Sequence, residues 1–302
     1  SENLQKRVRI AAAQAYFDLG QFSAVTEVLE QALRIDGDDI EAHRILAGLY
    51  YDIGANPRAI HHLEAVARLD PRDPRPHRLI GLMRKDFQDY PAAVSAYRES
   101  LERGPADSLA AEIRLELAQS LSEQRNYAAA LDALDETTCT PEVLAVRIRC
   151  FRILGQMSEL KRAVSEALAI KDPPLALQIE LGDYFASVDD LDNSIDCYQK
   201  AVALDPVDFV PRYKLSTVYS RAGRLEEAKQ ELDASLAKRQ LFDRLHALQN
   251  QAMQNPNDAD LRFQIGQAAL ALERQDLARA WFSAALGLDP GHAAAREAMR
   301  QK

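Results

Sequence analysis

A repeat of 34 residues is the feature that most constrains what this chain can fold into. If the residue two places after the turn inside each helical hairpin is taken as a landmark, successive landmarks are 34, 34, 37, 30, 34, 34 and 50 residues apart. This period is typical of arrays in which each repeat is a pair of helices that buries its apolar face against its neighbours. The landmarks are Phe22, Asn56, Tyr90, Tyr127, Met157, Leu191, Leu225 and Gln275.

Three columns of the repeat indicate how the helices of one unit pack. With each unit numbered from 1 to 34, positions 8 and 20 are small in nearly every unit and position 24 is large. Two helices approach closely only where neither carries a bulky side chain, so the small columns predict the helix crossing. The apolar residues follow helical spacing, and no stretch alternates with the period of a half-buried strand. The small pairs include Gly81 with Ala93 and Gly266 with Ala278.

The same columns carry a resemblance to a known family. The last unit holds Ile265-Gly266, Ala278, Phe282, Ala285 and Pro290. This pattern resembles the tetratricopeptide repeat, whose signature runs Leu-Gly-x-x-Tyr, Ala-x-x-x-Phe and then Pro. The resemblance extends over residues 6–292. It implies an all-α, right-handed α-α superhelix (a solenoid), with the first helix of each unit on the inner, concave surface. An irregular helical bundle is the alternative.

We predict a single domain over residues 1–302 that contains about eight hairpins. A 16-residue excess before the last unit predicts an extra helix over 241–254, which either continues the preceding helix or follows a short break. The polar segment 293–302 predicts a C-terminal capping helix. The expected units are residues 6–39, 40–73, 74–107, 111–140, 141–174, 175–208, 209–242 and 259–292.

The fifth unit departs from the small-residue rule. Ile148 and Leu160 replace small residues at positions 8 and 20, which should hold its two helices further apart. The preceding segment, Thr137-Thr138-Cys139-Thr140-Pro141, is a poor helix former. Together these features predict a bend or soft joint over residues 137–160.

Composition and motifs exclude several functional classes. A formal net charge of -9 without a basic block disfavours nucleic acid as a partner. No apolar run is long enough to predict membrane insertion within this chain. The chain has no phosphate-loop, dinucleotide, zinc-protease, serine-hydrolase or Cys-x-x-Cys motif. We therefore expect no enzyme activity, cofactor or metal.

The cysteines and histidines add two weaker expectations. Three scattered cysteines fit a reducing compartment, so we expect a cytoplasmic protein. The chain begins at Ser1 rather than Met, so a longer native N-terminus would leave a periplasmic or membrane-tethered location open. We expect His43 and His77 to pack between helices and His61 and His62 to lie on the surface.

The resemblance implies that positions 2, 5, 9 and 12 of each first helix face the groove. Cationic groove positions of units 2, 3 and 5, with one tyrosine beside them, are the candidate partner-binding residues. An arginine side chain suits carboxylates because it donates two parallel hydrogen bonds, so an acidic extended segment is the candidate partner. The candidate site residues are Arg44, Tyr51, Arg75, Arg78, Lys85, Arg149 and Arg152.

The sequence leaves more than one functional reading open. The first is a non-catalytic scaffold that binds a peptide segment or partner protein in the concave groove. The alternative is an accessory repeat array cut from a larger enzyme or membrane-tethered assembly. A third reading is an oligomer that assembles through its outer face.

Overall fold

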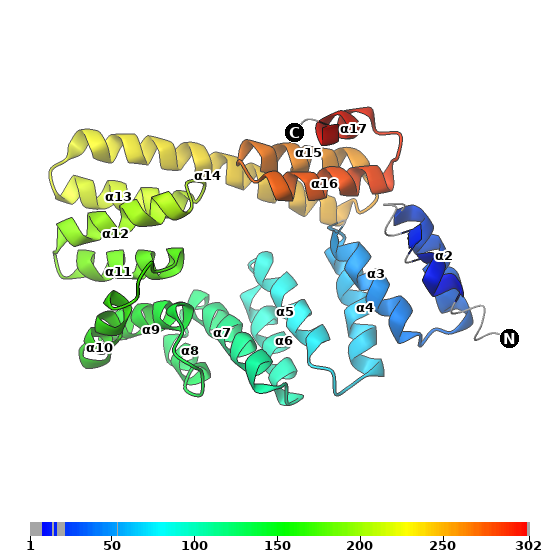
Figure 1. Ribbon diagram of the computed structural model, residues 1–302, viewed down its shortest axis with the longest axis horizontal. Helices are drawn as coiled ribbons and strands as arrows, with labels where there is room; N and C mark the ends of the chain where they lie inside the picture. The colour runs from blue at the N-terminus through cyan, green and yellow to red at the C-terminus, as the bar shows by residue number, and fades with distance from the viewer. Residues whose placement is uncertain (1–7, 14, 17–21, 53, 301–302) are drawn as a thin grey trace. The chain divides into compact units, whose positions relative to one another are not determined.

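The computed structural model describes residues 8–13, 15–16, 22–52 and 54–300. Within these ranges the chain consists of helices joined by short turns and contains no strand (Figure 1). The predicted all-α class is therefore confirmed. Part of the first helix expected in unit 1 lies outside the described residues.

The chain divides into two compact units. Residues 81–240 form the central unit, and residues 1–80 with 241–302 form the terminal unit. The prediction of one domain stays a prediction. The first helices of the hairpins are α3 (Ile40–Asp52), α5 (Arg75–Asp86), α7 (Asp107–Glu123), α9 (Pro141–Leu154), α11 (Leu175–Ser187), α13 (Phe209–Arg221) and α15 (Ala259–Ala271). The second helices are α2 (Phe22–Ile35), α4 (Asn56–Leu69), α6 (Tyr90–Glu102), α8 (Tyr127–Ala133), α10 (Met157–Leu168), α12 (Leu191–Leu204), α14 (Leu225–Gln254) and α16 (Gln275–Leu288), and α17 (Ala293–Arg300) ends the fold.

The repeat register predicted from the sequence is confirmed. Each landmark residue is the first residue of a second helix, from Phe22 in α2 to Gln275 in α16. The residue two places before the landmark has a left-handed backbone conformation in every turn from unit 2 onward. Glycine adopts this conformation without steric strain, yet only three of these turns contain it. The residues and their φ angles are Gly54 (68°), Gln88 (59°), Arg125 (61°), Gly155 (71°), Asp189 (63°), Gly223 (74°) and Glu273 (58°).

The small residue at position 8 makes room for the side chain at position 24. A Cβ atom placed on Gly266 would lie 2.5 Å from the ring of Phe282 and 3.2 Å from the carbonyl oxygen of Ala278. A Cβ on Gly182 would lie 2.6 Å from the ring of Tyr198, so a methyl group would clash in either hairpin. Glycine occurs at position 8 only in the units with an aromatic ring at position 24, and units with leucine there have alanine or serine. These pairs are Gly81 with Tyr97, Gly182 with Tyr198 and Gly266 with Phe282.

The fifth hairpin packs differently. Ile148 and Leu160 are both buried between α9 and α10, and these helices approach each other over less of their length than α15 and α16 do. On its other side, α10 makes little contact with α11. A pocket of about 600 Å³ lies there, and the half-exposed Leu168 and Leu204 stand at its edge. The segment before α9 is non-helical up to Thr140, whose hydroxyl group caps α9 by accepting a hydrogen bond from the Val143 amide at 3.3 Å.

The extra residues before the last hairpin extend an existing helix. Residues 241–254 continue α14, so the first of the two predicted alternatives is confirmed. Arg262 of α15 is fully buried and donates to the carbonyl oxygens of Ala252 (3.3 Å) and Pro256 (2.9 Å), which satisfies the open end of α14. Burial lowers the pKa of Arg262 to about 10. The predicted capping helix is α17.

Candidate functional site

Two of the candidate arginines bind a carboxylate of the chain itself. Asp73 is buried at the end of unit 2 and accepts hydrogen bonds from Arg75 Nε (2.8 Å) and Nη2 (2.9 Å). Arg44 Nη2 lies 3.3 Å from the same carboxylate. Burial alone would raise the pKa of Asp73, but the hydrogen bonds and positive charge of Arg75, together with Arg44, lower it below its usual range. Both arginines are thus already engaged, and Arg78 and Tyr51 also interact with other groups of the chain.

The other two arginines belong to a chain of ion pairs that joins successive first helices of the central unit. Arg149 of α9 donates to Glu180 of α11 (2.6 Å) and to Glu123 of α7 (2.8 Å). Burial alone would lower the pKa of Arg149, but Glu180 and Glu123 raise it above its ordinary value. Arg149, Glu123 and Glu180 belong to a larger set of ion pairs that we call the central ion-pair network.

The network continues through a second carboxylate of α11. Arg152 lies 3.3 Å from Glu180 and 2.9 Å from Asp183, and Lys214 of α13 binds Asp183 at 2.7 Å. Tyr198 also donates its hydroxyl hydrogen to Asp183, and burial with this negative charge raises the pKa of Tyr198. Three cations and three carboxylates therefore neutralise one another across four helices. The members are Glu123, Arg149, Arg152, Glu180, Asp183 and Lys214.

The sequence predicted a row of cations along the groove, but four of these arginines are paired with carboxylates of the chain itself. The sequence argument considered only positions 2, 5, 9 and 12, whereas Glu180 and Lys214 occupy position 6 and Asp73 occupies position 34 of their units. The arginines stabilise the array, and their role toward a partner stays a prediction.

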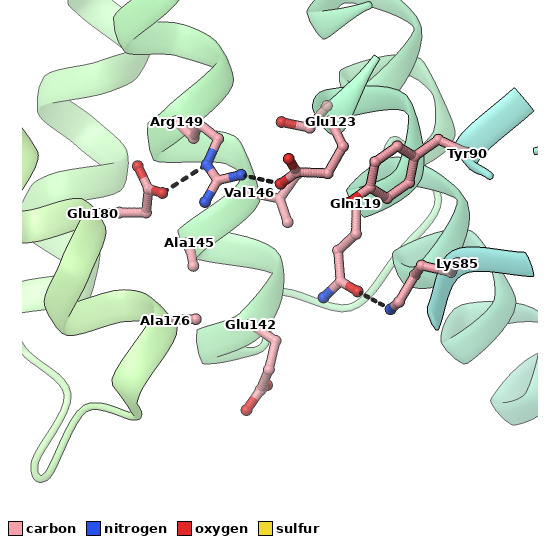
Figure 2. Close-up of a pocket in the computed structure, with 11 residues that line it drawn as sticks. Lys85, Tyr90, Gln119, Glu123, Glu142, Ala145, Val146, Arg149, Ala176 and Glu180 are labelled. Atoms are coloured by element: carbon pink, nitrogen blue, oxygen red, sulfur yellow. Dashed lines mark hydrogen bonds and ion pairs between the residues drawn. The ribbon is translucent and has the colours of Figure 1, made fainter. Parts of the chain in front are cut away.

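A pocket opens on the first helices beside the network. It has a volume of about 320 Å³ and is formed by side chains of α5, α7, α9 and α11, with Tyr90 at the start of α6 (Figure 2). Lys85 is the one candidate site residue that lines it apart from Arg149. The Lys85 ammonium group donates a hydrogen bond of 2.9 Å to the side-chain oxygen of Gln119, a neutral group. The full lining is Lys85, Tyr90, Gln119, Ser122, Glu123, Glu142, Ala145, Val146, Arg149, Ala176 and Glu180.

The histidines of unit 2 differ from expectation in one respect. His43 is buried, as predicted, but His62 is half-buried rather than on the surface. The Nδ1 atoms of His43 and His62 are 2.8 Å apart, and the His62 ring stacks on Tyr50 with 5.5 Å between centroids. Burial, with the positive charges that His43 and His61 can carry, lowers the pKa of His62 to about 4. His62 follows the exposed His61 in α4 but faces the interior of the hairpin, so the prediction that both lie on the surface was wrong for His62.

Neither a membrane-spanning helix nor a metal-ligand cluster occurs in the part of the chain that the structure describes. None of the helices described is both long enough and apolar enough to cross a membrane. In the same part of the chain, no group of three or more His, Cys, Asp or Glu side chains is arranged to hold a metal ion.

The hairpins, their register and the pocket on the first helices define a helical-repeat protein of the solenoid class. Tetratricopeptide repeat models match residues 16–83, 80–142, 176–208 and 213–293, which together span more than half of the chain. The chain belongs to the tetratricopeptide repeat family. Arrays of this family are typical non-catalytic scaffolds that bind proteins or peptides.

Several solved structures are similar to this chain. A chain of the Cut9–Hcn1 hetero-tetramer of the APC/C superposes with a TM-score of 0.53 at 15% identity, covering 97% of this chain and 55% of that chain. PilW, a type IV pilus biogenesis factor, matches with a TM-score of 0.48 at 14% identity, covering 70% of this chain and 97% of that one. MamA from Desulfovibrio magneticus RS-1 matches with a TM-score of 0.40 at 19% identity over 67% of this chain and 95% of its own. No curated protein sequence matches this chain significantly.

Proposed function

We propose that this chain is a non-catalytic scaffold that docks a segment of a partner protein against the first helices of its central unit. The observation that carries the proposal is the pocket of about 320 Å³, because four successive first helices contribute side chains to it. A surface built from equivalent positions of neighbouring repeats suits an extended chain that runs across them. The family, whose members bind proteins or peptides, supports the same function.

An acidic segment is the narrower form of this proposal. The central ion-pair network and Asp73 already neutralise Arg44, Arg75, Arg149 and Arg152. An acidic partner would have to displace these carboxylates, and truncating or displacing one member of such a pair leaves the other poorly compensated. Lys85 has no such competitor, since it binds an amide. We therefore place the acidic residue of the partner at Lys85 rather than along the arginines.

The alternative function, an accessory array within a larger enzyme or membrane-tethered assembly, uses the same docking surface. In that case the partner segment belongs to another part of the assembly. Cut9–Hcn1 is a hetero-tetramer of the APC/C, and this chain covers 55% of the matching chain. A cytoplasmic location is proposed on the cysteine usage alone.

Site-specific photo-crosslinking tests the proposed surface. A benzophenone side chain would be placed at Ala176, which is exposed at the pocket, and in a matched variant at Ser165, which is exposed on α10. Partners would be captured in cells of the native host and identified by mass spectrometry. We expect a partner that crosslinks from Ala176 and not from Ser165. A partner that crosslinks only from the α10 position would overturn the proposal.

Reversing Arg75 to glutamate is a poor test of partner binding. The substitution would leave the buried Asp73 facing a second negative charge, so a loss of binding could reflect unfolding. Lys85→Glu is the better variant because Lys85 is half-buried and makes no ion pair within the part of the chain that the structure describes. We expect Lys85→Glu to weaken capture from Ala176 with little change in the thermal unfolding midpoint.

A further inference from the structure

The charged groups that line the pocket are of two kinds. Arg149, Glu123 and Glu180 bind one another, at 2.8 Å and 2.6 Å, and so offer little uncompensated charge. Lys85 and Glu142 differ, because neither makes an ion pair among residues 8–13, 15–16, 22–52 and 54–300. The pocket thus presents one cation and one carboxylate that form no ion pair among the described residues, although the neighbouring Asp86 attracts Lys85 electrostatically.

Lys85 is placed to accept a negatively charged group. It lies half-buried in the last turn of α5, and an ammonium group has three donors. Gln119 uses one of them at 2.9 Å, which orients the side chain along the pocket wall (Figure 2). The remaining donors are free for a carboxylate, and a charge-assisted hydrogen bond is about twice as strong as a neutral one.

Glu142 offers the opposite charge at another edge of the pocket. It is exposed in the first turn of α9, where the partial positive charge of the helix N-terminus favours a carboxylate. The side chain points away from Lys85 and Gln119 in the close-up view (Figure 2). It can therefore receive an ammonium or guanidinium group from outside.

Part of the pocket lining consists of small, apolar side chains. Ala145, Val146 and Ala176 line this part of the pocket, so a backbone can approach closely without meeting a long side chain. Lys85 and Glu142 lie on first helices with α7 between them, so their helix axes are about 16–20 Å apart at a spacing of ~8–10 Å per helix. Because Glu142 points away from Lys85, the two charges stay about as far apart as the helix axes, and an extended segment at ~3.3 Å per residue would place its two charges about five to six residues apart.

We propose that the pocket recognises a mixed-charge peptide segment, with an acidic residue at Lys85, a basic residue at Glu142 and small residues between them. This inference rests on the proposed function and specifies its ligand. A purely acidic segment would meet Glu123, Glu142 and Glu180, and a purely basic one would meet Lys85 and Arg149. For a given peptide, only one direction along the helices pairs both charges.

Defined peptides test the inference on the full chain. The probes are fluorescent, terminally blocked nonapeptides of Ala, Ser and Gly that carry one Glu and one Lys, in both orders and at spacings of two to six residues. Matched peptides carry only the Glu, only the Lys or neither, and binding is measured by fluorescence polarisation. We expect peptides that carry both charges, at a spacing of five to six, to bind at least about 10-fold more tightly than the peptide with neither charge.

Charge exchange provides the decisive variant. Lys85→Glu should abolish the preference for the peptide Glu, and Glu142→Lys the preference for the peptide Lys. The double variant Lys85→Glu/Glu142→Lys keeps the net charge and one charge of each sign, so it should restore the binding of mixed-charge peptides that each single variant weakens. The control is Lys161→Glu/Glu159→Lys on α10, where both side chains are exposed and Glu159 also lies in the first turn of its helix.

Each result decides between the possibilities. The inference is overturned if no probe binds, if the double variant binds mixed-charge peptides no better than the single variants, or if the α10 control has the same effect. If a native partner still crosslinks from Ala176 while the charge exchange changes nothing, the mixed-charge inference fails and the proposed function stands. If crosslinking occurs only from Ser165, the proposed function itself fails.

Discussion

Hairpins α15–α16 and α9–α10 occupy equivalent places in the repeat but are stabilised in different ways. In α15–α16 the glycine at position 8 lets the Phe282 ring fill the crossing, and the two backbones pack closely along their length. In α9–α10 the larger Ile148 and Leu160 keep the helices less closely packed, and α9 is instead tied to α7 and α11 by Arg149 and Arg152. Close packing within a hairpin and ion pairs between hairpins are thus alternative ways to hold one repeat in the array.

Removing the carboxylate that Arg149 and Arg152 share should cause the largest loss in the free energy of unfolding. Glu180→Ala deprives both Arg149 and Arg152 of a side chain that is only 3% exposed. Each arginine keeps one other carboxylate and is partly solvated, so we expect a loss of about 2–4 kcal/mol, near the lower end for a broken buried pair. The measurement is the urea midpoint followed by circular dichroism. The control is Glu159→Ala on α10, and equal shifts in both variants would contradict a special role of the network.

Overpacking the crossing of α15 and α16 should cause an intermediate loss of stability. Gly266→Leu adds atoms where a Cβ already lies 2.5 Å from Phe282, so we expect a loss of about 1–3 kcal/mol. Gly48→Leu in α3 is the matched control, because no atom lies within 4 Å of a Cβ placed there.

A second variant of the same hairpin separates steric conflict from helix propensity. Gly266→Ala/Phe282→Leu recreates the alanine–leucine pair found at Ala47 and Leu63. It should be more stable than the sum of its single substitutions predicts, and additive effects would rule out the conflict between positions 8 and 24.

The smallest expected difference is local: the backbone of the joint before α9 should open more readily than the helices do. Thr137–Thr140 lie outside any helix between α8 and α9. Few apolar side chains are buried there, so amide hydrogen exchange should be faster than in α3–α4. Exchange measured by mass spectrometry on peptic fragments tests this, and equal protection in both regions would argue against a joint.

The sequence predicted the fold better than the site because the two depend on different information. The start of every second helix, α17 and the extension of α14 follow from periodicity and small-residue columns, which record local packing. The pairing of Arg75 with Asp73 and of Arg149 with Glu180 depends on how neighbouring units stack. The list of groove positions contains the arginines and one partner, Asp183, but not Glu180 or Asp73, because these carboxylates occupy positions 6 and 34 and reach the same surface from the side.

The left-handed residue in each hairpin turn from unit 2 onward is a position where mutation can raise the stability of the array step by step. At Gln88, Arg125 and Glu273 a side chain is held at φ angles of 59°, 61° and 58°, a conformation that costs a non-glycine residue on the order of 1 kcal/mol or more. Glycine would relieve that strain but would also loosen the unfolded chain, so each exchange should raise stability by ~0.5–1 kcal/mol at most. Because the turns lie in separate repeats, such gains should add, and unfolding midpoints of the single and triple variants would measure this directly. Because each turn belongs to one repeat, stability can change one hairpin at a time while the residues of the proposed docking surface stay the same.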